Sequence, residues 1–228
     1  MKSLAVAFAF VLVAAGSAMA APPNTLTDQE KAAGWKLLFD GRTLDGWRGF
    51  KAAAPDAGWR VADGAVAPDP KTSKDIITKA EYGSFELAFE WKISKLGNSG
   101  VMYHVIEKGD ETYESGPEYQ ILDNAHGEVP LQQAGSLFAL YAPLVDATRP
   151  PGEWNQGRIV VDHGHVQHWL NGTKVVEYDL GSADFKARVA ASKFKQWPQF
   201  AASPTGHIAL QNHGDAVAFR SLKIRVLK

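Results

Sequence analysis

The chain of 228 residues contains no cysteine. It can therefore form no disulfide, and it has no thiol that could act as a nucleophile. An excess of one charge is also missing, because 24 basic residues stand against 25 acidic ones and the formal net charge is −1. A near-neutral chain without basic runs lacks the electrostatic footprint of a nucleic-acid-binding protein.

Long hydrophobic runs are absent as well, since no stretch approaches the ~18 apolar residues of a transmembrane helix. The apolar run 4–15 follows Lys2 and precedes the small residues of 17–20, which is typical of a secretory signal peptide cleaved after Ala20. Without a cysteine at the cleavage site, we expect no lipid anchor. Residues 1–20 are thus predicted to be a signal peptide, and the protein to be periplasmic or secreted without a membrane anchor.

Helical periodicity is scarce. A capping-box pattern at Thr27 and Glu30 predicts one short helix, and a second short helix is expected within 183–200. Alternating or apolar segments bounded by turn residues predict strands at 35–39, 75–78, 84–94, 99–106, 116–122, 154–162, 165–170 and 174–180. Hairpins are predicted at 59–67, with a turn at Asp63-Gly64, and around Gly214 at the end of the chain. This pattern predicts an all-β sandwich of two antiparallel sheets, formed by residues 21–228 as a single domain.

The segment "GPEYQILDN", residues 116–124, suggests where chemistry could occur. Side chains alternate between the two faces of a strand, so Tyr119 and Ile121 fit the core while Glu118 and Gln120 face away from it. The same rule places Val101, Tyr103 and Val105 in the core with Met102 and His104 opposite, and Ile208 and Leu210 in the core with Gln211 and His213 opposite. If these strands are neighbours, the outward residues line one groove: His104, Glu118, Gln120, Gln211 and His213.

Other sites are weaker. His168 shares its face with Val166 and Leu170 and is expected to be structural, whereas Trp169 points the other way and could form a platform for a sugar. The histidines of "DHGHVQH" (162–168) splay around a hairpin turn, which disfavours a zinc site. The acidic loop 107–114 leaves only a weak possibility of a structural divalent cation. We expect no metal in the site and no cofactor.

Six motifs in order resemble the 3-keto-disaccharide hydrolase family: "LLFDGRTLDGW", "GNSGVMYHV", "GPEYQILDN", "PGEWNQGRIVV", "HVQHWLNGTKVVEY" and "GHIALQNHGDAVAFRSLKIR". The resemblance implies a concanavalin A-like, laminarinase-like jelly roll. It also implies hydrolysis of 3-keto-glycosides, in which the glucose ring is already oxidised at carbon 3. A separate glycoside 3-oxidoreductase would supply that substrate, so no nicotinamide is needed here.

This substrate gives the candidate residues roles. A ketone at carbon 3 acidifies the hydrogen at carbon 2, so a base can remove that proton, the group at carbon 1 can leave, and water can add afterwards. We expect Glu118 and His213 to be catalytic, one as the base and the other as the acid or orienter. Ring hydroxyls and the ketone would be held by Asn98, His104, Gln120, Asp123 and Gln211, with Trp169 as a further substrate-binding residue.

The segment "LQQAGSLFALY" (131–141) departs from the family pattern. Gln132-Gln133 stand where relatives carry His and a basic residue, and Phe138-Ala139 replace a Tyr-Asp pair. His104 likewise stands where many relatives carry Arg. These changes keep an alternative open, a non-catalytic lectin-like carbohydrate-binding module with a shallow groove and no converging titratable pair.

Overall fold

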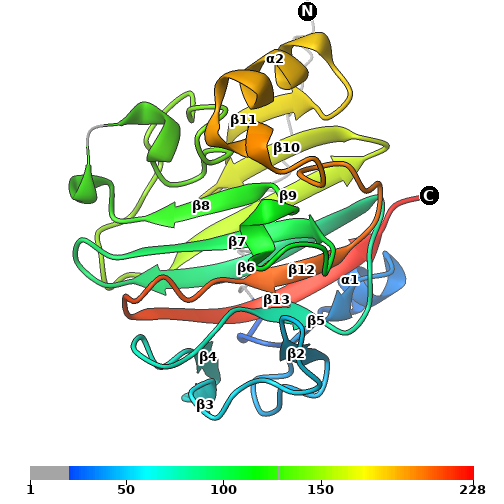
Figure 1. The fold of residues 1–228 in the computed structure, drawn as a ribbon. Helices are drawn as coiled ribbons and strands as arrows, with labels where there is room; N and C mark the ends of the chain where they lie inside the picture. The colour runs from blue at the N-terminus through cyan, green and yellow to red at the C-terminus, as the bar shows by residue number, and fades with distance from the viewer. Residues whose placement is uncertain (1–20, 128) are drawn as a thin grey trace, which may run out of the picture.

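The structure is a computed structural model that describes residues 21–127 and 129–228, so the expected signal peptide lies outside the described residues. Two antiparallel sheets lie face to face as a jelly-roll β-sandwich (Figure 1). The larger sheet has eight strands: β1 (Lys36–Leu37), β3 (Arg60–Ala62), β4 (Ala65–Ala67), β6 (Phe85–Ile93), β9 (Asn155–Asp162), β10 (His165–Leu170), β11 (Thr173–Asp179) and β13 (Val217–Val226).

The smaller sheet has five strands, in the order β2-β5-β12-β7-β8. Their bounds are β2 (Trp47–Gly49), β5 (Ile76–Thr78), β7 (Asn98–Val105), β8 (Glu118–Leu122) and β12 (His207–Leu210). Strands β12, β7 and β8 are therefore neighbours, although they come from distant parts of the chain. This adjacency is the condition under which the predicted outward residues can meet.

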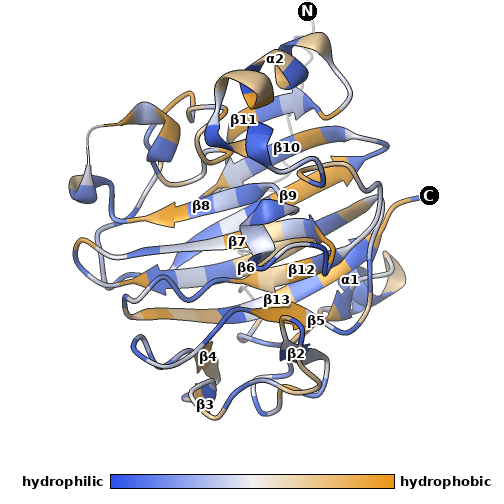
Figure 2. Ribbon diagram, viewed as in Figure 1, coloured by the Kyte–Doolittle hydropathy of each residue, from blue (hydrophilic) through white to orange (hydrophobic). Residues whose placement is uncertain are grey.

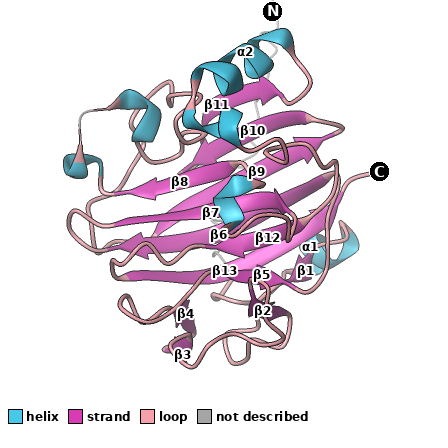
Figure 3. Ribbon diagram, viewed as in Figure 1, coloured by secondary structure: helices cyan, strands magenta, loops and turns pink. Residues whose placement is uncertain are grey.

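Helical structure is minor (Figure 3). Within residues 21–127 and 129–228, the α-helices are α1 (Asp28–Ala32) and α2 (Ala183–Ala191), and the 3-10 turns are η1 (Thr112–Glu114), η2 (Asn124–His126), η3 (Pro130–Gln132) and η4 (Lys193–Gln196). The capping box predicted at Thr27 and Glu30 is present at the start of α1. In the described part of the chain, no helix has the length and apolarity needed to cross a membrane.

The core lies between the sheets and follows the alternation of the sequence. In β6, Phe85, Leu87 and Phe89 are buried in the main hydrophobic cluster, whereas Glu90 and Lys92 lie on the outer face. The same banding of apolar and polar residues is visible along the strands in Figure 2. Burial of these apolar side chains supplies the main driving force for folding.

His168 is a structural residue of the core, as its apolar neighbours on β10 predicted. Its side chain is fully buried, and Nδ1 lies 3.1 Å from the Gly135 carbonyl oxygen while Nε2 lies 3.2 Å from the Tyr103 hydroxyl. A neutral imidazole that donates from Nδ1 to the carbonyl and accepts at Nε2 from Tyr103 satisfies both ring nitrogens. Burial lowers the pKa of His168 to about 4, which keeps the ring neutral.

The alternation of side chains predicted for β7 is wrong at His104 and Val105. Tyr103 and His104 form a β-bulge, because β7 has one residue more than β12 between the pairs Val105↔His207 and Met102↔Ala209. His104 has a φ of 54°, and the bulge reverses the phase after it. Val105 therefore packs with Met102 on the outer side instead of in the main core, while His104 packs edge-on against Phe85.

Candidate active site

A pocket of about 200 Å³ lies on the outer face of the five-stranded sheet. It combines residues from β7, β8, the segment after β12, the loop after β8 and the turns η1 and η4. Five of the eight predicted site residues line it, namely Asn98, Glu118, Gln120, Gln211 and His213, together with Tyr113, Phe138 and Lys193. Strand alternation thus predicted the outward direction of Glu118, Gln120 and Gln211 correctly.

Glu118 begins β8 and is 7% exposed. Burial raises the pKa of its carboxyl group to about 8, and the nearby Lys193 ammonium acts in the opposite direction. A carboxyl group with a pKa near neutrality is suited to exchanging a proton with a substrate.

Gln120, Asn98 and His213 form a short hydrogen-bonded relay. The Gln120 amide donates to Asn98 Oδ1 over 3.2 Å, and Asn98 Nδ2 lies 3.3 Å from His213 Nδ1. When Asn98 Nδ2 donates to Nδ1, the proton of the neutral imidazole resides on Nε2. The relay therefore orients the ring and leaves an Nε2–H donor for a ligand.

Two acceptor atoms in the pocket are unused. The Oε1 atoms of Gln120 and Gln211 are buried and have no hydrogen-bond partner within the described residues. A buried polar atom without a partner costs about 1–3 kcal/mol, so a ligand that donates to these atoms recovers that energy. Hydroxyl groups of a sugar are donors of the required kind.

The segment Gln211–His213 is held in place by the residue between its two pocket side chains. Asn212 turns to the other side, where its Nδ2 donates 2.8 Å to the Ser73 carbonyl and its backbone N–H donates 3.0 Å to Asp75. The backbone N–H of Gln211 continues the sheet by donating 3.0 Å to the Gly100 carbonyl. These hydrogen bonds anchor Asn212 and so fix the backbone positions of Gln211 and His213 on either side of it.

Lys193, Tyr113 and Phe138 are pocket residues that sequence reasoning missed. The Lys193 ammonium lies 4.6 Å from the ring centre of Phe138 and 5.3 Å from that of Tyr113. Burial lowers the pKa of Lys193, against the opposing effect of Glu118. Lys193 comes from η4, more than seventy residues after Glu118, and strand alternation carries no signal for it.

The other three predicted residues lie elsewhere. His104 is buried at the bulge, where Nε2 donates 2.8 Å to the Gly83 carbonyl, so the prediction that it faces the groove is wrong. Asp123 accepts backbone N–H groups of Leu96 and Ala125 at 2.8 and 3.2 Å and shapes the loop instead of lining the pocket. Trp169 lies on the outer face of the opposite sheet.

The described residues contain no group of three or more His, Cys, Asp or Glu side chains that could hold a metal ion. In the loop 107–114, Glu107 receives two hydrogen bonds from Arg48, at 2.6 and 2.9 Å, and Asp110 pairs with Lys51 at 3.2 Å. In 162–168, His163 contacts Asp162, His165 contacts Asp179, and His168 is in the core, so these rings diverge as expected.

Fold and pocket together define a β-sandwich protein with a small pocket of titratable and amide side chains on the outer face of one sheet. The chain belongs to the family described as the 3-keto-alpha-glucoside-1,2-lyase-like domain, whose model matches residues 34–225. It is 33% identical over 245 aligned positions to a 3-keto-disaccharide hydrolase of Bacteroides thetaiotaomicron, covering 92% of this chain and 84% of that protein.

Two solved structures from Parabacteroides distasonis, both of candidate glycosyl hydrolases, are similar to this chain. The first is 36% identical with a TM-score of 0.85, and the match covers 91% of this chain and all of that one. The second is 29% identical with a TM-score of 0.68, covering 85% and 99%. The fold and the family predicted from the sequence are therefore confirmed.

Proposed function

We propose that this protein cleaves glycosides whose glucose ring carries a ketone at carbon 3, by elimination across carbons 1 and 2 followed by hydration. The observation that carries the proposal is the convergence of Glu118, His213 and Lys193 in one small pocket with two unused amide oxygens. Membership of the 3-keto-alpha-glucoside-1,2-lyase-like family supports the same chemistry.

Glu118 is assigned as the base that removes the proton from carbon 2. Its raised pKa makes the carboxylate a stronger base than an ordinary glutamate, and its value near 8 still allows ionisation near neutral pH. The C2–H electrons form an enolate with the ketone, and the enolate then expels the oxygen at carbon 1. The products of this step are an enone and the released alcohol.

His213 is assigned as the proton donor to the departing oxygen. With Asn98 Nδ2 donating to Nδ1, the imidazole proton would lie on Nε2, where a donor is needed; the hydrogen bond from Gln120 to Asn98 Oδ1 supports this orientation of the Asn98 amide. Water then adds its hydroxyl group to carbon 1 and its other proton returns to His213, while the proton held by Glu118, after exchange with solvent, is delivered to carbon 2. Both residues return to their starting states, the net reaction is hydrolysis, and no oxidant or reductant is required.

Lys193 is assigned the role of stabilising the negative charge that develops on the ketone oxygen. A cation directed at charge that forms only in the transition state accelerates the reaction, typically by about 10²–10³-fold. Gln120 and Gln211 would bind ring hydroxyls through their free Oε1 atoms. We further propose that a separate glycoside 3-oxidoreductase makes the keto sugar and that both proteins work outside the cytoplasm.

The test is to incubate residues 21–228 with 3-keto-trehalose, 3-keto-lactose and a 3-keto aryl glucoside, with the unoxidised sugars as controls. We expect release of the leaving group from the keto forms only, and its loss in Glu118→Gln and His213→Ala. In D₂O the released keto sugar should carry deuterium at carbon 2 above the level of an enzyme-free control. Cleavage of an unoxidised sugar, or product without added deuterium, would contradict the proposal.

A further inference from the structure

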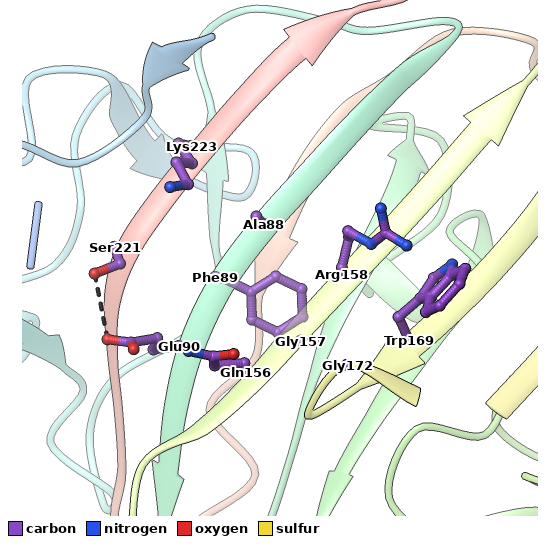
Figure 4. Close-up of a pocket in the computed structure, with 10 residues that line it drawn as sticks. All are labelled: Ala88, Phe89, Glu90, Gln156, Gly157, Arg158, Trp169, Gly172, Ser221 and Lys223. Carbon is purple, nitrogen blue, oxygen red and sulfur yellow. Dashed lines mark hydrogen bonds between the residues drawn. The ribbon is translucent and has the colours of Figure 1, made fainter. Parts of the chain in front are cut away.

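A second hollow lies on the outer face of the eight-stranded sheet, on the side of the sandwich opposite Glu118. It has a volume of about 310 Å³ and is lined by residues of β6, β9, β10 and β13 (Figure 4). We propose that this hollow is a second carbohydrate-binding site, which holds a neutral, unoxidised glucan. This inference does not depend on the chemistry proposed for Glu118.

The hollow arises because a small residue stands between long ones. Ala88 pairs across the sheet with Arg158 on β9 and with Lys223 on β13. The methyl group of Ala88 forms a floor, and the two long side chains rise on either side of it. A flat ligand can therefore approach the sheet at this point.

Trp169 supplies a rigid wall. The guanidinium carbon of Arg158 lies 4.1 Å from the centre of the Trp169 ring, and the indole N–H donates 3.1 Å to Gln167 Oε1. The ring is half-buried and held from two directions before any ligand binds. Arg158 lies between Ala88 and Trp169, so a sugar ring in the hollow packs against this stacked pair. A pair that is already fixed loses little entropy on binding.

The opposite wall provides hydrogen-bonding groups. Ser221 lies at a bulge of β13 with a φ of 53°, and its hydroxyl donates 3.3 Å to Glu90 (Figure 4). The exposed side-chain amide of Gln156 offers a donor and an acceptor at the edge. An aromatic wall facing hydroxyl, carboxylate and amide groups matches a polyhydroxylated ring.

The charges around the hollow favour a neutral ligand. Glu90 accepts a hydrogen bond from Arg220 at 2.6 Å, Arg158 donates to Glu86 at 2.9 Å, and Lys223 pairs with Glu30. Each charged side chain that lines the hollow is therefore already paired, although Glu86 is shared by Arg158 and Arg225. Because these charges are engaged with one another, an uncharged glycan fits the hollow without breaking an ion pair.

The test uses maltotetraose, cellotetraose and laminaritetraose as probes of residues 21–228, with binding followed by calorimetry and by the NMR signal of the Trp169 indole N–H. We expect one of them to bind and to shift that signal. Trp169→Ala should weaken binding tenfold or more. Ala88→Leu, which fills the hollow and keeps the tryptophan, should weaken it as strongly.

Two controls decide whether the hollow is responsible. Trp154 carries a similar stack, with Arg220 at 4.1 Å, but lies outside the hollow, so Trp154→Ala should leave affinity within twofold. Glu118→Gln should also leave it unchanged while abolishing cleavage of keto sugars. Absence of binding at about 10 mM of all three glucans, equal losses in Trp154→Ala and Trp169→Ala, or loss of binding in Glu118→Gln would each overturn the proposal.

Discussion

Gly100 on β7 lies directly against the carboxyl group of Glu118 on β8. A Cβ atom at position 100 would come within 2.2 Å of Glu118 Oε1 and 2.8 Å of its carboxyl carbon. Any other residue would have to displace the carboxyl group, because such a separation is far inside van der Waals contact. The glycine thus provides the space in which the buried acid of the pocket sits.

Gly100→Ala should therefore lower kcat/KM for a 3-keto glycoside by at least about tenfold, since a misplacement of about 1 Å at a reacting group can cost 10²-fold. The protein should remain folded, because a terminal carboxyl group can rotate away from a methyl group. The control is Gly100→Ala combined with Glu118→Gln, which should be no less active than Glu118→Gln alone. An additional loss in the double variant would show that Gly100 acts through something other than Glu118.

The pH dependence of kcat/KM should report the ionisation of Glu118. Because the pKa of Glu118 is about 8 and the base must be ionised, kcat/KM should rise with pH and level off above about 8. Lys193→Met removes the charge that lowers this pKa, so the rise should move to higher pH, and the plateau should fall by about 10²-fold. Lys195→Met alters the same turn outside the pocket and should leave the profile unchanged.

The relay through Asn98 predicts a coupling between two substitutions. Asn98→Leu removes the hydrogen-bond partner of His213 and should lower kcat by about tenfold or more, because the imidazole loses its fixed orientation. In a His213→Ala background, the same substitution should cost much less. Independent, additive losses in the double variant would mean that Asn98 does not act through His213.

Much of the architecture could be predicted from the alternation of apolar and polar residues. β10 covers residues 165–170 as expected, and β6 spans Phe85–Ile93 within the predicted 84–94. The same rule placed Glu118, Gln120 and Gln211 on one outer face, because a period of two leaves little choice once Tyr119 and Leu210 are buried. Site residues on regular strands could therefore be predicted from the sequence.

The failures have a common physical cause, which is that alternation holds only within one uninterrupted strand. The bulge at His104 reversed the phase of β7, and no residue type in "VMYHV" indicates a bulge there. Trp169 was assigned the correct face of its own strand but lies in the other sheet, which a single strand does not reveal. Lys193 reaches the pocket from a turn, and turns place side chains by tertiary packing alone.

His168 should make the folded protein sensitive to acid. Its pKa is lowered from 6.5 to about 4, so the unfolded chain takes up the proton more readily, and stability should fall as pH drops from about 6.5 to about 4. The difference corresponds to about 3 kcal/mol. His168→Gln should be less stable at pH 7 but should lose less on acidification, as measured by urea unfolding. If the free energy of unfolding fell equally with pH in His168→Gln and in the unmodified protein, His168 would not be the source of the acid sensitivity.

Glu118 should have the opposite effect on stability. Its pKa in the folded protein is raised from 4.5 to about 8 by burial, so the folded state holds a proton that the unfolded state has released. The stability associated with the protonated acid is present below pH 4.5 and is lost as pH rises through 8, by at most about 5 kcal/mol. Loss of stability on ionisation is the consequence of keeping a base in a desolvated pocket.

Glu118→Gln keeps the shape of the side chain but cannot ionise, so it should be more stable than the unmodified protein at pH 9 and similar to it at pH 5. Urea unfolding at both pH values gives the difference, and Glu111→Gln, which alters an exposed acid just before η1, should show no such trend. A Glu118→Gln advantage that is the same at both pH values would mean that the carboxyl group is not buried in its neutral form. The base proposed for the reaction would then lose its physical basis, because the same burial that destabilises the fold at high pH strengthens Glu118 as a base.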